Sequence, residues 1–132
     1  MKKSRDKQIV DNDEITIEGI TFRKMTAGTF TLCDMANISI INGKGGQYEL
    51  FEINAFLWIH NVDPKEARAK IFDESMGKDS EGRSLSFVNA VMDWADEIPL
   101  TAYANLAKTV GSMVDDSFKN AVVPDEKNEG NK

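Results

Sequence analysis

Hydrophobic residues in this chain gather in short clusters between polar stretches, and the densest cluster lies near the middle. The segment from Tyr48 to His60, YELFEINAFLWIH, leaves no face of a 3.6-residue helix without an apolar group. A helix that is apolar nearly all round must be covered on several sides. We therefore expect this segment to be the central helix of the fold, with the other segments packed around it.

Two shorter elements are predicted before the central helix. Apolar and polar residues alternate on both sides of Glu18-Gly19, which predicts a β-hairpin. A short helix follows, with Thr26 or Thr29 as its cap, and ends near Asn37. The expected inner face of this helix consists of Phe30, Leu32, Cys33, Met35 and Ala36. The glycine-rich stretch from Asn42 to Gly46 predicts a pliable loop.

Three further helices are predicted after the central one. Asp63 with Pro64 is a strong start signal for a helix that runs to Met76, and Ser84 can cap the next helix, which Pro99 ends. The last helix begins near Leu100. The apolar face expected for the first of these helices is Ala67, Ile71 and Phe72. That of the second consists of two stripes: Leu85, Val88, Met92 and Ala95, and Phe87, Val91, Trp94 and Ile98.

Together these elements predict a mainly α fold with a small N-terminal β-hairpin (α+β), a compact bundle of about five helices around a buried central helix. We expect three regions. Residues 1–14 form a flexible N-terminal segment, residues 15–123 a single globular helical domain, and residues 124–132 a disordered C-terminal tail. The last helix is expected to end before Pro124.

Composition narrows the classes of partner. The 132 residues carry a formal net charge of −6, which disfavours binding to nucleic acid and favours a basic protein partner. A single cysteine excludes an intrachain disulfide. The sequence contains neither a secretory signal nor an apolar run long enough for a membrane span, so we expect a soluble intracellular protein without membrane contact.

No pattern in the chain indicates catalysis. His60 and Cys33 stand far apart without a zinc-type spacing, and we interpret them as a helix-end histidine and a buried thiol. We therefore expect no enzyme activity, no cofactor and no metal. Acidic residues cluster at Asp93, Asp96 and Glu97 and at Asp115 and Asp116; they are interpreted as solvated charges, with docking to a basic partner as the alternative. Trp58, Trp94, Met35, Met92 and Met113 are at core spacing, although some of the methionines could instead line a partner groove.

The order of several segments resembles that of the tail assembly chaperones of long-tailed bacteriophages and prophages. These segments are EGITFRKMTAGTFTLCDMAN, FEINAFLWIH, DPKEARAKIF, VMDWADEIPL and, within the last helix, GSMVDDSF. The resemblance covers about Glu18 to Pro124 and includes no catalytic signature.

The resemblance implies a non-catalytic cytoplasmic protein of the infected bacterium that coats the tape measure protein and keeps it soluble. Tail tube subunits then replace the chaperone, which is absent from the mature virion. The implied partners are therefore the tape measure protein and the tail tube protein, and self-association stays open. As partner-binding residues we predict the last helix and its end: Met113, Phe118, Val122 and Val123, rimmed by Asp115 and Asp116.

Two other classes of function remain open at this point. The first is a structural virion protein, such as a head–tail or tail completion subunit, which we would expect to be richer in strands. The second is a small acidic regulatory or inhibitory protein. An acidic mimic of nucleic acid needs a continuous acidic stripe, whereas basic residues are interleaved here: Lys65, Arg68, Lys70, Lys108 and Lys119.

Overall fold

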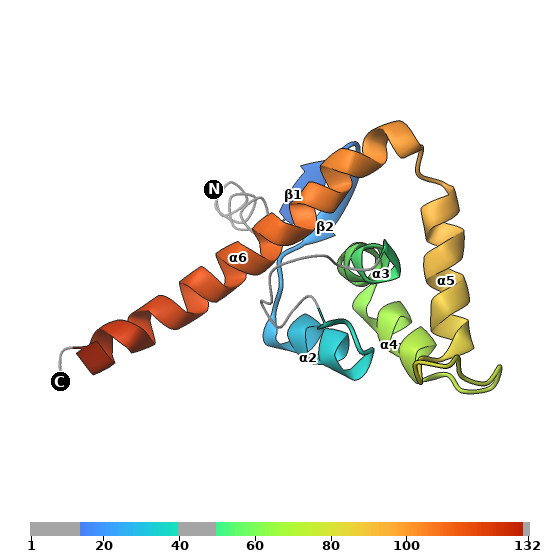
Figure 1. Cartoon of the computed structure of the whole chain (residues 1–132), viewed down its shortest axis with the longest axis horizontal. Coiled ribbons are helices and arrows are strands. Elements are labelled where there is room, and N and C mark those ends of the chain that lie inside the picture. Colours follow the sequence, from blue (N-terminus) through green and yellow to red (C-terminus); the bar gives the residue numbers. More distant parts are fainter. Residues whose placement is uncertain (1–13, 40–49, 131–132) are drawn as a thin grey trace, which may run out of the picture.

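The computed structural model describes residues 14–39 and 50–130, with side chains as far as Asp116. This part of the chain forms a two-stranded antiparallel hairpin and five helices (Figure 1). The elements are β1 (Glu14–Ile17), β2 (Ile20–Arg23), α2 (Ala27–Met35), α3 (Leu50–Asn61), α4 (Pro64–Phe72), α5 (Leu85–Asp96) and α6 (Leu100–Gly130). The predicted mainly α fold with an N-terminal hairpin is confirmed.

Helix α3 is the centre of the structure. Strand β2 and helices α2, α4, α5 and α6 all pack against it. Ala55, Phe56, Leu57 and Ile59 are fully buried and Trp58 is nearly so, which places one and a half turns of helix out of contact with water. The prediction of a covered central helix is therefore confirmed from Ala55 onward, whereas Leu50, the first residue of α3, keeps 67% of its surface.

The hairpin turn has the backbone that its register requires. Ile17 pairs with Ile20, which leaves Glu18 and Gly19 as a two-residue turn with φ angles of 55° and 80°. Positive φ at both positions is the mark of a type I′ turn, in which a glycine is favoured at the second position. The turn is also attached to α6, because the Asn105 amide donates a 2.7 Å hydrogen bond to the Glu18 carboxylate.

The predicted helix caps are present at three starts. Thr26 caps α2 in a reciprocal capping box with Thr29. Asp63 accepts a hydrogen bond from the Lys65 amide, directly before Pro64 at the first position of α4. Ser84 accepts a hydrogen bond from the amide of Phe87 at the start of α5. Local sequence signals thus locate these helix starts without reference to the rest of the fold.

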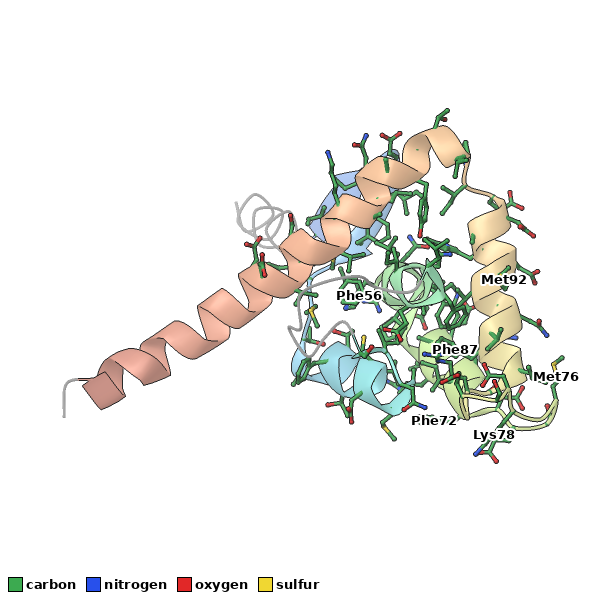
Figure 2. All side chains as sticks on the ribbon, in the orientation of Figure 1. Phe56, Phe72, Met76, Lys78, Phe87 and Met92 are labelled. Atoms are coloured by element: carbon green, nitrogen blue, oxygen red, sulfur yellow. The ribbon has the colours of Figure 1, made fainter. Side chains whose placement is uncertain are left out.

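Several residues predicted to face inward are instead exposed. Phe30, Met35, Phe72 and Met92 keep between 39% and 55% of their surface. Figure 2 shows Phe72 and Met92 on the outside of the body, whereas Phe56 and Phe87 lie in its interior. The reason is coverage: α2 packs mainly on α3, and α4 and α5 pack on α3 and on each other. Each of these helices therefore buries a narrower strip than its apolar pattern offers.

Helix α6 is longer than predicted. Its first half packs on α3 and β1 through Leu106, Val110, Met113 and Val114, and its second half extends away from the body (Figure 1). The helix continues through Pro124 to Gly130, so the predicted end before Pro124 is wrong. A proline inside a helix removes one backbone hydrogen bond, and the good helix formers Glu126 and Lys127 follow it.

Other predicted regions lie largely outside the described residues. Of the predicted flexible segment 1–14, the structure describes only Glu14, which begins β1. The predicted glycine-rich loop at residues 42–46 and the last two residues, 131 and 132, are not among the described ones. Among the helices that are described, none is both long enough and apolar enough to cross a bilayer.

Side-chain hydrogen bonds connect the carboxyl end of α3 to neighbouring elements. The Arg23 guanidinium from β2 donates hydrogen bonds to the carbonyl oxygens of Ile59 and Val62. A cation at this position also interacts favourably with the helix dipole. The Asn61 side chain donates to the carbonyl of Thr21 and accepts from the Trp94 indole, each at 3.0 Å. The last turn of α3 is therefore fastened to both the hairpin and α5.

His60 lies fully buried within this last turn. Its Nδ1 atom is 2.8 Å from the carbonyl oxygen of Phe56, so the neutral ring carries its proton on Nδ1. Its Nε2 atom is buried without a partner among the described residues. Burial lowers the pKa of His60 to about 4, and the nearby Arg23 charge adds to this effect.

The burial pattern predicts unequal costs for two phenylalanine truncations. Phe87 is fully buried, with its ring 5.8 Å from Phe51 and 5.5 Å from Trp58, whereas Phe72 is half exposed. Phe87→Ala should lower the free energy of unfolding by about 3–5 kcal/mol because it opens a cavity in the core. Phe72→Ala should cost less than about 1 kcal/mol. Urea denaturation of the two variants measures both values, and equal losses would contradict this assignment of faces.

The neutral state of His60 predicts a loss of stability in mild acid. Its pKa is about 4 in the folded protein against 6.5 unfolded, so the unfolded chain binds the proton first as the pH falls. The contribution of neutral His60 to the free energy of unfolding is therefore present above pH 6.5 and is lost progressively as the pH falls from 6.5 to 4. Between pH 7 and pH 5 the free energy of unfolding should fall by about 2 kcal/mol. Urea titrations at the two pH values test this, and the fall should disappear in His60→Gln; a fall of the same size in that variant would exclude His60 as its cause.

Candidate functional site

The structure separates the residues predicted to bind a partner. Met113 is only 5% exposed and belongs to the core that packs on α3, so its assignment to an exposed groove is wrong. Asp115 and Asp116 are exposed on the following turn of α6. Phe118, Val122 and Val123 lie further along α6, beyond the last described side chain, and their role stays a prediction. Periodicity cannot distinguish the apolar residues of a long helix that pack into the core of the same protein from those that remain available to a partner.

The other candidates from the sequence are mostly structural. Cys33 is buried, and burial raises the pKa of its thiol to about 12, which leaves it protonated and unreactive at neutral pH. Asp93, Asp96 and Glu97 are all exposed, as solvated charges should be. No group of three or more His, Cys, Asp or Glu side chains within the described residues is placed to hold a metal ion.

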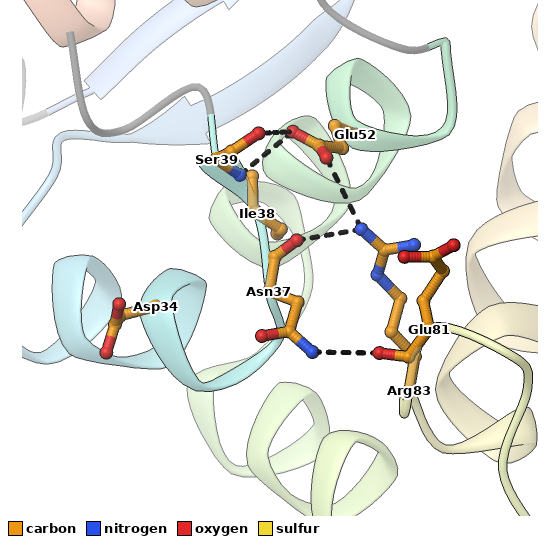
Figure 3. A pocket seen from close by; sticks show the side chains of 7 residues that line it. All are labelled: Asp34, Asn37, Ile38, Ser39, Glu52, Glu81 and Arg83. Atoms are coloured by element: carbon orange, nitrogen blue, oxygen red, sulfur yellow. Dashed lines mark hydrogen bonds and ion pairs between the residues drawn. The ribbon is translucent and has the colours of Figure 1, made fainter. Parts of the chain in front are cut away.

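A buried ion pair joins three segments that are distant in sequence. The Arg83 side chain comes from the loop before α5, and its guanidinium lies 3.4 Å from the carboxylate of Glu52 on α3 (Figure 3). The same guanidinium donates to the carbonyl oxygens of Ala36 and Asn37. The second oxygen of Glu52 accepts from the amide and the hydroxyl of Ser39, each at 2.9 Å. Both carboxylate oxygens are thus used inside the protein.

This ion pair is a cross-link within the fold. Arg83 also lies over the Phe51 ring, with its central carbon 5.0 Å from the ring centroid. The Asn37 backbone has a φ of 62°, which aims its carbonyl at Arg83 while its side-chain amide donates to the carbonyl of Glu81. A polar pocket of about 340 Å³ opens beside the pair, with Asp34 and Glu81 on its wall. The pair and its carbonyl partners hold α2 and the loop before α5 to α3.

Reasoning from sequence missed Arg83 because it lies in the polar stretch from Gly77 to Ser84, between two predicted helices. The loop is in fact ordered by local contacts: the Asp79 carboxylate accepts from the amides of Glu81 and Arg83, and Lys78 pairs with Ser84 in a β-bridge. No local signal in the sequence distinguishes this arginine from a solvated one.

A second hollow lies between α4 and α5, above α3. It is an open hollow with a volume of about 520 Å³, and its apolar lining includes Trp58, Val62, Ala90 and Trp94. Trp94 is half-buried, and its indole nitrogen already donates a hydrogen bond to Asn61. The apolar ring of Trp94 is therefore the part that is available for contact in this hollow. We call this hollow the α4–α5 groove. It combines an aromatic floor with walls made by two helices, which is the form that suits an amphipathic partner helix.

Hydrogen bonds join α4 and α5 at one end of the α4–α5 groove. The Ser84 hydroxyl lies within hydrogen-bond distance of the carbonyl oxygens of Lys70 and Asp73. The Ser86 hydroxyl donates a 2.6 Å hydrogen bond to the Asp73 carboxylate. Hydrogen bonds from Ser86 and then Ser75 lower the pKa of Asp73 to about 2, so the carboxylate stays charged throughout the neutral range. These contacts fix the spacing between the end of α4 and the start of α5.

Comparison with known proteins identifies no family: no family model matches the chain, and neither the curated proteins nor the solved structures include a significant match.

The ion pair predicts that Arg83 cannot be replaced by lysine. Arg83→Lys keeps the charge but loses the planar fork that reaches two carbonyl oxygens and Glu52 together, so the free energy of unfolding should fall by about 2–3 kcal/mol. Arg68→Lys is the matched control, because Arg68 is exposed on α4, and it should change stability by less than about 0.5 kcal/mol. Chemical denaturation gives both numbers. Equal stability of the two variants would show that the buried fork contributes nothing.

Proposed function

We propose that this chain is a non-catalytic tail assembly chaperone of a long-tailed bacteriophage or prophage, which binds the tape measure protein during tail assembly and keeps it soluble. The observation that carries the proposal is the order of segments from Glu18 to Pro124 that resembles this family. Its site of action would be the bacterial cytoplasm, with the tail tube protein as the partner that later displaces it.

The architecture is compatible with holding another chain. A body built around one buried helix leaves two features without partners in the described structure: the second half of α6, which extends past the body, and the α4–α5 groove. Binding of a long helical client calls for modest affinity at each copy, with many copies bound along its length. Large apolar side chains at the surface supply such contacts, and here they include Phe72, Met76 and Met92.

The alternatives have less support. A structural virion protein was expected to be richer in strands, and the described residues contain one two-stranded sheet beside five helices. An acidic inhibitor that imitates nucleic acid needs an uninterrupted acidic surface. On α4, however, the exposed Glu66 is flanked by the exposed Lys65 and Arg68.

The proposal predicts that this chain solubilises a specific client. The client is the product of a very long, helix-rich reading frame that should follow the gene. When that product is expressed alone it should be found in the insoluble fraction, because its extended apolar helices have nothing to cover them. Co-expression with this chain should move most of it to the soluble fraction, where the two should co-purify.

Co-expression of an unrelated acidic protein of similar size is the control. A client that stays insoluble with this chain present, or that is equally soluble with the control protein, contradicts the proposal. So does finding this chain in stoichiometric amount in mature particles, since an assembly chaperone leaves before the virion is complete.

A further inference from the structure

The α4–α5 groove has the dimensions and the lining of a binding site for side chains. Its volume of about 520 Å³ lies in the range of ligand-binding clefts. Trp58 forms part of the floor from α3, and Trp94 and Ala90 line it from α5. Met76 contributes at the lining while keeping 54% of its surface, so a flexible apolar side chain can adapt to whatever enters.

The charges on the two walls identify the chemistry of the occupant. Glu66 lines the groove from α4 and Asp93 lines it from α5, and both are exposed. Lys70, one turn after Glu66, is the basic residue in the lining. The lining therefore carries two carboxylates on opposite walls and one ammonium group, a net negative charge. This arrangement favours a partner with an apolar centre and basic flanks.

The form of the walls identifies the backbone of the occupant. Both walls are helices, whose backbone groups are bonded internally, so they provide no free strand edge to which an extended peptide could add. A helix binds instead through side chains spaced three and four residues apart on one face. Such a face can place apolar groups on Trp94 and Met76 and basic groups beside Glu66 and Asp93.

We propose that the α4–α5 groove binds an amphipathic, basic helix of a partner chain, with apolar side chains of that helix against Trp94 and Met76 and its Lys or Arg side chains paired with Glu66 and Asp93. This inference rests on the proposed function in so far as the partner is the client chain. It locates client binding on the face formed by α4 and α5, whereas the sequence alone directed attention to the end of α6.

The test uses a probe peptide and the protein's own fluorescence. The probe is a designed peptide of about four helical turns, with leucine at helical spacing on one face and lysine elsewhere. A counterpart has glutamate in place of every lysine. The chain contains two tryptophans. Trp94 lines the groove at its surface, so occupancy changes its emission, whereas Trp58 beneath it is almost completely buried and changes less. Titration of the full-length protein with each peptide gives the two dissociation constants.

Matched double variants separate the groove from non-specific attraction to an acidic protein. Glu66→Lys with Asp93→Lys reverses the wall charges, and Asp34→Lys with Glu81→Lys makes the same change at exposed residues outside the groove. Each pair raises the formal net charge by four units, from −6 to −2. All four positions are exposed, and thermal unfolding checks that each variant stays folded.

The wild-type protein should bind the lysine peptide and not the glutamate peptide. The Glu66 and Asp93 double variant should weaken binding of the lysine peptide about tenfold and admit the glutamate peptide, and the Asp34 and Glu81 variant should weaken it less than about twofold. Equal weakening in both variants would reduce the effect to net charge and overturn the proposal. Loss of binding only on Asp115→Lys with Asp116→Lys would place the site on α6 and also overturn it.

Two other occupants would appear as distinct results, and each would overturn the proposal. If a second copy fills the groove, sedimentation of the wild type will show a dimer that the Glu66 and Asp93 variant dissociates. If the chain's own first 13 residues fill it, their removal will strengthen peptide binding.

The co-expression assay separates this inference from the proposed function. A client solubilised equally by wild type and the groove variant refutes the groove alone, whereas peptide binding at the groove without client solubilisation refutes the chaperone function alone.

Discussion

Burial of helix α3 on all sides is the constraint on which the rest of the structure depends. Five consecutive residues, 55–59, are almost entirely removed from water, and no single neighbouring helix can cover them. The hairpin strand β2 and four helices together provide the cover. Helices α2, α4 and α5 therefore use only part of their apolar pattern in the core, and the unused part remains at the surface as exposed phenylalanine and methionine.

A helix buried in this way also needs partners for the polar groups near its ends. Near its start, Glu52 forms an ion pair with Arg83 and accepts a hydrogen bond from the Ser39 amide. At its last turn, the carbonyl oxygens of Ile59 and Val62 accept from Arg23. An unpaired charge or carbonyl at either place would be costly away from water. The two arginines thus connect the hairpin and the loop before α5 to the same helix. His60, in the last turn, is kept neutral by its burial and by the nearby charge of Arg23.

The same arrangement determines which surfaces are available to other molecules. The first half of α6 is committed to the core, so Met113 is unavailable, while the second half extends beyond the body. Helices α4 and α5 meet above Trp58 and leave the α4–α5 groove between them, with Trp94 held by Asn61 on one wall. A chain that binds by side-chain contacts at these places needs no catalytic group, which agrees with the proposed chaperone role.

Much of the local structure could be predicted from the sequence, because it depends on near neighbours. The turn at Glu18-Gly19, the caps at Thr26, Asp63 and Ser84, and the all-round apolar character of α3 are such features. Tertiary structure decided the rest. The pairing of Arg83 with Glu52 spans 31 positions, and neither residue carries a local signal of it. The exposure of Phe72 and the burial of Met113 follow from which neighbours cover each helix, and an apolar pattern shows only the face that can be buried, not the part of it that is.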